Sequence, residues 1–420
     1  MGRFHGLIGI ALILTIAFLF SNNKKHINPR VILSGLALQI IIAVLVLKVP
    51  FIAGIFQKAG GALQKIEQFA KAGSDFVFGG IAVVSGSEVQ NYATPHQFVF
   101  AFNVTATIIL VCVLVAVMYH IGLMQKIVAI VAKGMNYIMK VSGAEALSNV
   151  ASAFVGQVEA QVMIRPYLKG MTKSELLASM SGSLACIAGS ILIVYANMGA
   201  QAGLDLAPKL IMASLMAAPG ALVISKIVMP ETEVSETMGN VKLKVKSEYT
   251  NIIDAISQGA GDGFKIALNV IAMLIGFIAA IALIDYFLLK IGHIFSADLT
   301  LSLDYIFSKI FYPFAWAMGV PSEDISSAAT LLGQKLSINE FIAFKNMTSH
   351  DVPVMTEKGL LIITTAICGF ANFASVGMQI GGIGALAPER RKDLASLGMK
   401  ALLCGTLASY LSASIAGILF

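Results

Sequence analysis

Long apolar runs separated by short polar segments cover most of the chain, and they constrain its fold more than any other feature. Of the 420 residues, 57% are hydrophobic and 12% are charged, about half the charged fraction of a soluble domain, roughly 25%. Apolar runs of this length predict membrane-spanning helices, because lipid offers no hydrogen bonds to an open backbone. The 38 glycines suit close packing between such helices. The sequence therefore predicts an all-α polytopic membrane protein.

Eight apolar runs are predicted to cross the lipid bilayer, and the basic residues orient them. Lys and Arg concentrate in cytoplasmic loops. The predicted location is the cell inner (plasma) membrane, with the loops at Lys24, Lys173, Lys244 and Arg391 in the cytoplasm and both termini on the outer side. The stretch from 56 to 78 carries lysines at helical spacing and predicts an interfacial amphipathic helix. The spans are Leu7–Ser21, Val31–Phe51, Phe98–Leu123, Leu176–Met198, Leu210–Met229, Phe264–Leu289, Gly359–Leu386 and Leu394–Phe420.

Two stretches place a carboxylate inside otherwise apolar sequence. Gln157, Val158 and Glu159 lie within Ala144–Leu168, and Glu340 lies within Leu301–Phe344. A charge at the bilayer centre costs at least about 2.5 to 3.5 kcal/mol, so these residues need polar partners inside the protein. Both stretches are too interrupted to span cleanly, and we predict that each forms a re-entrant hairpin.

Each predicted hairpin is followed by a glycine-rich span and then by another helix. By the positive-inside rule, the two hairpins are predicted to enter from opposite faces of the membrane, and this arrangement predicts an inverted repeat. Glycine and serine between Ser181 and Ser190 fit either close packing or an unwound break. The resulting units are residues 1–140 (N-terminal helices and interfacial helix, scaffold), 141–230 (first hairpin repeat), 231–250 (cytoplasmic linker), 251–299 (interfacial piece and sixth helix, scaffold) and 300–420 (second hairpin repeat).

The sequence argues against several other classes of protein. The net charge of +6 comes from dispersed basic residues rather than one patch, so no nucleic-acid partner is predicted. Nucleophile elbows, phosphate loops and paired metal-binding histidines are not found in the sequence. We therefore predict no cofactor and no enzyme activity, and a membrane-embedded enzyme or structural subunit is the weaker alternative. A symporter, with its site between two polar interruptions near the midplane, fits better.

Several motifs in the same order resemble those of the concentrative nucleoside transporter family over almost the whole chain. The resemblance implies a homotrimer with eight membrane helices and two opposed hairpins, which takes up nucleosides such as uridine and adenosine by an elevator motion. A symporter of another small polar metabolite is the nearest alternative. The matching segments are Phe154–Ala160, Ile187–Ser190, Ala217–Gly220, Met229–Glu233, Ala267–Val270, Ile338–Phe341, Cys368–Asn372 and Ala387–Arg391.

The resemblance also implies a role for individual residues. Gln157 and Glu159 are expected to serve the nucleobase, with Phe370 against its face and Ile191 lining its pocket, whereas Glu340, Asn372 and Ser375 are expected to hold the ribose. A carboxylate and an amide can accept from and donate to vicinal hydroxyls, and a glutamine matches an amide-like base edge. Val158 stands where many relatives carry Thr or Ser, so base preference is left open.

The coupling ion is predicted from the same resemblance. Sodium-coupled members of the family use positions that here read Ser152, Val155, Cys186 and Ile187. The carbonyls at these positions survive any side-chain change, but a thiol is a poor ligand for a hard cation. We favour Na+ because the carbonyls and one hydroxyl remain, and H+ coupling through Glu159 or Glu340 is the alternative.

Overall fold

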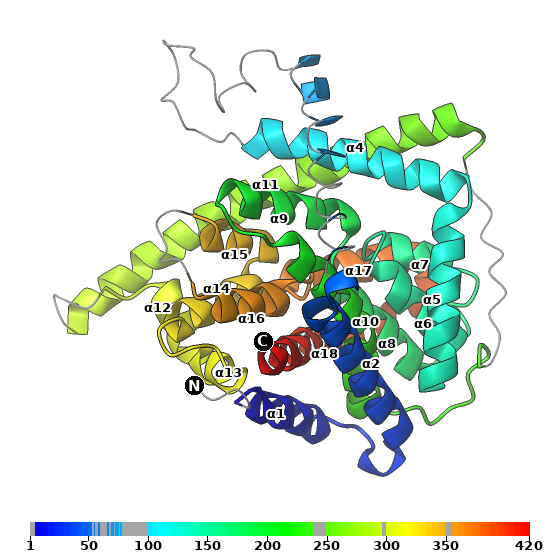
Figure 1. The fold of residues 1–420 in the computed structure, drawn as a ribbon, viewed down its shortest axis with the longest axis horizontal. Helices are drawn as coiled ribbons and strands as arrows, with labels where there is room; N and C mark the ends of the chain where they lie inside the picture. Colours follow the sequence, from blue (N-terminus) through cyan, green and yellow to red (C-terminus); the bar gives the residue numbers. More distant parts are fainter. Residues whose placement is uncertain are drawn as a thin grey trace.

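The computed structural model describes residues 5–52, 100–238, 249–295, 300–349 and 355–420, with scattered residues between 54 and 77, and there it is helical without strands (Figure 1). The all-α prediction is confirmed. The helices are α1 (Gly6–Leu19), α2 (Pro29–Lys48), α4 (Phe100–His120), α5 (Leu123–Met139), α6 (Gly143–Ser152), α7 (Glu159–Met163), α8 (Lys173–Ala185), α9 (Gly189–Gln201), α10 (Ala207–Val228), α11 (Ile252–Phe295), α12 (Leu303–Ile310), α13 (Tyr312–Ala317), α14 (Ile325–Ser337), α15 (Glu340–Met347), α16 (Glu357–Ile367), α17 (Phe373–Leu386) and α18 (Arg391–Leu419).

Helices α8, α10, α16 and α18 form the centre of the bundle and are buried along most of their length (Figure 1). Small residues let them approach closely: a Cβ added at Gly405 of α18 would lie 2.9 Å from Cβ of Leu184 in α8. Gln39 of α2 adds a polar link, because its Nε2 donates to the Met216 carbonyl at 2.9 Å and to the Ser412 hydroxyl at 3.0 Å. Close packing with a few buried hydrogen bonds is the expected cohesion of helices in lipid.

Helices α4 and α11 pack against each other at one edge of the bundle, at the top of Figure 1. Gly259 and Gly263 of α11 make this contact possible, since a Cβ at Gly263 would lie 2.7 Å from the α4 backbone at Ile109. The predicted sixth span and the amphipathic piece before it form one helix of 44 residues. No proline interrupts this stretch, which explains its continuity.

Four helical segments in the described part of the chain are long and apolar enough to cross a membrane: Pro29–Lys48, Lys173–Gln201, Ala207–Val228 and Pro388–Leu419. A fifth arises if α4 and α5, bent by 77° at their junction, count as one span. Helices α1 and α17 are apolar but shorter. The membrane-protein prediction is confirmed, whereas the count of eight spans stays a prediction. The predicted interfacial helix at 56–78 lies mostly outside the described residues.

Two boundaries differ from the prediction. The second hairpin, predicted over Leu301–Phe344, separates into α12, α13 and the pair α14–α15, because prolines at 313 and 321 interrupt the apolar pattern. The pair alone turns back on itself, at Ile338 and Asn339. Helix α5 follows the third predicted span and is not among the predicted helices, because lysines interrupt its apolar pattern. Its buried face is Met124, Val128, Ala132, Met135 and Met139.

One order of helices occurs twice in the chain. A short helix pair (α6–α7, then α14–α15) precedes an interrupted helix (α8–α9, then α16–α17) and a long helix (α10, then α18). The question left open at 181–190 is decided in favour of a break, since α8 ends at Ala185 and α9 begins at Gly189. The predicted seventh span has a similar break at 368–372.

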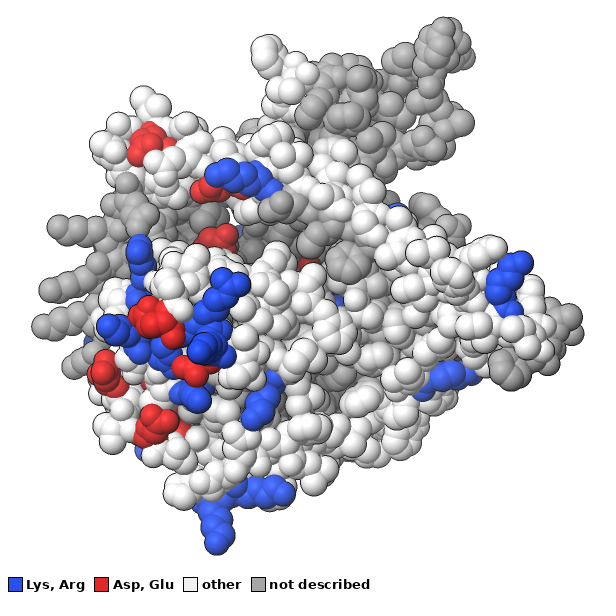
Figure 2. All heavy atoms as spheres, turned by 180° about the vertical axis from the view of Figure 1, so that it is seen from behind, with Lys and Arg blue, Asp and Glu red and all other residues white. Residues whose placement is uncertain are grey.

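Charged side chains gather on one part of the face drawn in Figure 2, and the rest of that face is largely uncharged, as expected for a surface in lipid.

Inside the bundle, Lys226 of α10 pairs with Glu145 of α6 at 2.7 Å and with Glu231 at 3.3 Å. Ser235 and Thr237 are buried and donate to Glu175 at the start of α8. The first residues of the predicted 231–250 linker therefore hold the ends of α6 and α8 together, and residues 239–248 lie outside the described part.

Candidate functional site

The two helix breaks and the first hairpin tip meet at one place. The Phe370 amide donates to the Cys186 carbonyl at 3.3 Å, which joins one break to the other. Gly369 has a φ of +132°, and a Cβ there would run into the Ala185 carbonyl, so the crossing of the two breaks requires glycine. The Gly189 amide donates to the Phe154 carbonyl at 3.2 Å, which fastens the tip of the first hairpin to the first break.

The first hairpin tip presents Gln157, Val158 and Glu159. Gly156 before them has a φ of +132°, which turns the chain out of α6. Gln157 is buried; its Oε1 accepts from Gln379 Nε2 at 3.5 Å, and its Nε2 lies 3.9 Å from the Met378 sulfur. Glu159 starts α7 and is exposed to the adjoining cavity. A negative charge suits a helix N-terminus, so the fold itself favours this placement.

The second hairpin tip presents Glu340, whose two carboxylate oxygens have separate donors. Tyr195 OH donates to Oε1 at 3.1 Å, and Asn372 Nδ2 donates to Oε2 at 3.0 Å. Asn372 is held in place because its own Oδ1 accepts from the Ser375 amide at 2.8 Å and caps α17. Tyr195 in turn stacks on Phe344, with ring centroids 4.3 Å apart. Glu340 is thus buried but oriented by two long-range hydrogen bonds.

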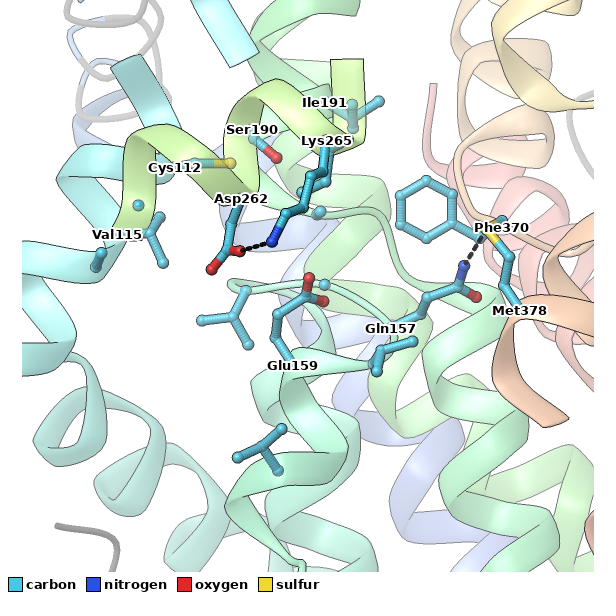
Figure 3. A pocket seen from close by; sticks show the side chains of 18 of the residues that line it. Cys112, Val115, Gln157, Glu159, Ser190, Ile191, Asp262, Lys265, Phe370 and Met378 are labelled. Carbon is cyan, nitrogen blue, oxygen red and sulfur yellow. Dashed lines mark hydrogen bonds and ion pairs between the residues drawn. The ribbon is translucent and has the colours of Figure 1, made fainter. Parts of the chain in front are cut away.

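A cavity of about 800 Å³ opens between these tips, the two breaks and the pair α4–α11 (Figure 3). All eight residues predicted to bind substrate line it: Gln157, Val158, Glu159, Ile191, Glu340, Phe370, Asn372 and Ser375. The opposite wall carries Cys112, Tyr119, Asp262 and Lys265. Figure 3 shows Glu159 pointing towards the ion pair of Asp262 and Lys265, whose charged atoms lie 3.6 Å apart.

Sequence reasoning missed Tyr195, Asp262 and Lys265 as wall residues of this cavity. Tyr195 had a signal, since it places a hydroxyl in an apolar span four residues after Ile191. Asp262 and Lys265 gave none, because charges near the start of α11 read as an interfacial stretch. Their position depends on how α11 packs against α4.

The four candidate sodium positions are close in the fold but differ in surroundings. Val155 lines the cavity, whereas Cys186 and Ile187 are fully buried at the first break. The Ser152 hydroxyl lies 2.7 Å from the Ser148 carbonyl and 2.8 Å from the Ser183 hydroxyl. The Cys186 sulfur lies 3.9 Å from the carbonyl oxygens of Asn149 and Ser214. One hydroxyl and nearby carbonyls fit a hard cation, and the thiol does not.

Three family models match the chain in order along its length. They are described as "Na+ dependent nucleoside transporter N-terminus" at residues 8–81, "Nucleoside recognition" at 101–202 and "Na+ dependent nucleoside transporter C-terminus" at 209–417. The nucleoside permease NupC of Helicobacter pylori is 35% identical over 98% of this chain and 96% of its own length. Human sodium/nucleoside cotransporter 1 is 36% identical over 96% of this chain and 62% of its own length.

Solved structures resemble the fold over the whole chain. CNTnw in an inward-facing substrate-bound state is 37% identical, with a TM-score of 0.89, covering 99% of this chain and 98% of that one. A CNTnw variant in an outward-facing state is 38% identical, with a TM-score of 0.91, covering 100% and 98%. Helical bundle, cavity and relatives together define a multi-pass membrane transporter, and not an enzyme. The chain belongs to the concentrative nucleoside transporter family, as its motifs predicted.

Proposed function

We propose that this protein imports nucleosides together with a cation. The observation that carries the proposal is the shared cavity: the eight residues predicted to bind substrate, three from their chemistry and the others from the family resemblance, all line it. Its polar groups include a carboxylate with amides at one end and a glutamine with a second carboxylate at the other. A nucleoside needs this combination, because its ribose carries vicinal hydroxyls and its base carries a polar edge and a flat apolar face.

The ribose is assigned to the second hairpin. Glu340 has lone pairs beyond those used by Tyr195 and Asn372, so it can accept from both vicinal hydroxyls. Ser375, in the first turn of α17, adds a hydroxyl that also lines the cavity. The base is assigned to the first hairpin, where Gln157 and Glu159 face the cavity, with Phe370 and Ile191 as its apolar walls. Val158 contributes no hydrogen bond to the base.

Transport is proposed to follow an elevator motion. The hairpin pairs, the breaks, α10 and α18 make up two repeats, 141–230 and 300–420, which enter the membrane from opposite faces and move as one body. Helices α4 and α11, with the rest of residues 1–140 and 251–299, form the scaffold, and 231–250 is the cytoplasmic linker. Relatives solved in inward-facing and outward-facing states support this division, as does a cavity with one wall from each part.

Sodium is the proposed coupling ion, bound near Ser152, Val155, Cys186 and Ile187. Family models described as Na+ dependent support it. Because Ser152 is already hydrogen-bonded to Ser183 and Cys186 is a thiol, sodium affinity is expected to be lower than in a site with two hard side-chain oxygens. Proton coupling through Glu159 or Glu340 is the competing mechanism.

Uptake into proteoliposomes tests the function and the ion together. Labelled uridine and adenosine are offered under an inward sodium gradient at clamped pH, and then under a proton gradient without sodium. We expect accumulation above equilibrium under the sodium gradient. Accumulation that follows only the proton gradient overturns the sodium assignment, and absence of nucleoside accumulation under either gradient overturns the proposed substrate.

The assembly and orientation are proposed as a homotrimer in the inner membrane with both termini outside. Helix α11 exposes large apolar side chains along most of its length, including Ile275, Ile284 and Phe287, which suits lipid or neighbouring subunits. Native mass spectrometry from detergent measures the subunit number, and a mass other than three chains rejects the trimer.

A further inference from the structure

The side chain of Lys335 is buried without a hydrogen-bond partner that would stabilise its charge. It lies in the last turn of α14, has no exposed surface, and its Nζ has no hydrogen-bond partner among the described residues. Burying a lone ammonium is strongly unfavourable. An ionisable group inside a membrane segment indicates a functional role by default, with a charged partner to be found.

The acidic residue that follows Lys335 in the same hairpin is Glu340, five residues further along, which is also buried and makes no direct hydrogen bond to Nζ. Lys335 lies at the C-terminal end of α14 and Glu340 at the first position of α15, so each charge stands at the helix end that stabilises it. The groups bonded to Glu340 are Tyr195 and Asn372, which are neutral donors. The positive charge at this tip therefore comes from Lys335.

Lys335 does not reach the substrate cavity. It is absent from the residues that line it, whereas Glu340, Asn339 and Phe341 all line it. The thiol of Cys368, at the second helix break, is buried as well. Lys335 is thus buried within the protein, whereas Glu340 forms part of the cavity wall.

We propose that Lys335 is the fixed counter-charge of Glu340, a positioning residue that keeps this carboxylate ionised and aimed at the ribose without touching the substrate. An ionised carboxylate only accepts hydrogen bonds, so it can take both vicinal hydroxyls as donors, whereas a protonated one spends an oxygen on its own O–H. The role of Glu340 rests on the proposed nucleoside function, but the pairing of the two charges does not.

A double-mutant cycle tests the pairing in the full-length protein. The variants are Lys335→Met, Glu340→Gln and both together, with Lys345→Met as the control, because Lys345 lies on α15 and is exposed. Uridine affinity is measured by binding to the purified proteins, and the midpoint of thermal unfolding is measured in the same detergent without substrate. The unfolding midpoint needs no nucleoside, so failure of the pairing and failure of the nucleoside function are distinguishable.

We expect Lys335→Met to lower uridine affinity by about tenfold or more, comparable to the loss of a charge-assisted hydrogen bond. The loss of affinity in Lys335→Met should be smaller for 2′,3′-dideoxyuridine than for uridine. The double variant should bind uridine with an affinity within about twofold of that of Glu340→Gln alone. The unfolding midpoint of the double variant should fall by less than the sum of its decreases in the two single variants, because each single change leaves one buried charge unpaired.

Three results overturn the inference. Native-like uridine binding by Lys335→Met overturns it. Losses of uridine affinity and of unfolding midpoint that are both additive in the double variant also overturn it. If Lys335→Met fails to fold, the double variant decides: recovery of folding in the double variant supports the pair, whereas failure of both beside a folded Glu340→Gln shows that Lys335 serves packing alone.

Discussion

Replacing Glu340 by Gln changes the charge at the second hairpin tip with little change in shape. Asn372 cannot turn to accommodate the change, because its Oδ1 is held by the Ser375 amide at 2.8 Å. The new amide must therefore offer its oxygen to Asn372 Nδ2 and its nitrogen to Tyr195 OH, which can accept. The hydrogen bonds to Asn372 and Tyr195 therefore survive in neutral form, and we expect insertion and assembly to be retained, with a lower unfolding midpoint because Lys335 loses its counter-charge.

The loss falls on the substrate, because the ribose hydroxyls would meet a neutral amide in place of a carboxylate. A hydrogen bond to a charged group contributes about 1.5 to 3 kcal/mol, which corresponds to roughly ten- to a hundredfold in affinity. Glu340→Gln should raise the uridine concentration for half-maximal uptake by that factor. Analogues without ribose hydroxyls should bind poorly to the native protein and be penalised less by the substitution.

The assay is uptake of labelled uridine into proteoliposomes, with 2′- and 3′-deoxyuridine as competitors and size-exclusion elution as the control for assembly. Near-native uridine affinity in Glu340→Gln would remove this residue from the site. An equal loss for uridine and for both deoxy analogues would also contradict the reasoning, because it would show that the carboxylate does not read the hydroxyls.

Three further predictions concern the base, the ion and the topology. Gln157→Ala should weaken uridine and adenosine uptake alike. Val158→Thr, which adds a hydroxyl beside Gly382 of α17, should change the order in which purine and pyrimidine nucleosides inhibit uridine uptake. An unchanged order would contradict this account of base selection. Cys186→Ser should lower the sodium concentration for half-maximal uridine uptake, measured at fixed pH, and no change would count against the sodium site. A cysteine at Val234, which is 94% exposed, should resist a membrane-impermeant reagent in intact cells and react after lysis, and labelling in intact cells would reverse the proposed orientation.

The class of protein and the polar residues at the two hairpin tips could be predicted from the sequence. Composition excluded a soluble domain, because only a membrane tolerates so few charges over 420 residues. Gln157, Glu159 and Glu340 stood out because carboxylates and carboxamides are costly in lipid. These properties belong to single residues and their neighbours in the chain, so they can be read without a fold.

Tertiary structure alone decided which groups meet. Tyr195 reaches Glu340 across 145 positions of sequence, and Asp262 and Lys265 face Glu159 only because α11 packs on α4. No signal in the sequence marked Lys335, whose side chain the fold buries completely in the last turn of α14. A sequence pattern shows that a polar group needs a partner, but the partner is selected by long-range packing, which brings distant segments to within hydrogen-bond distance.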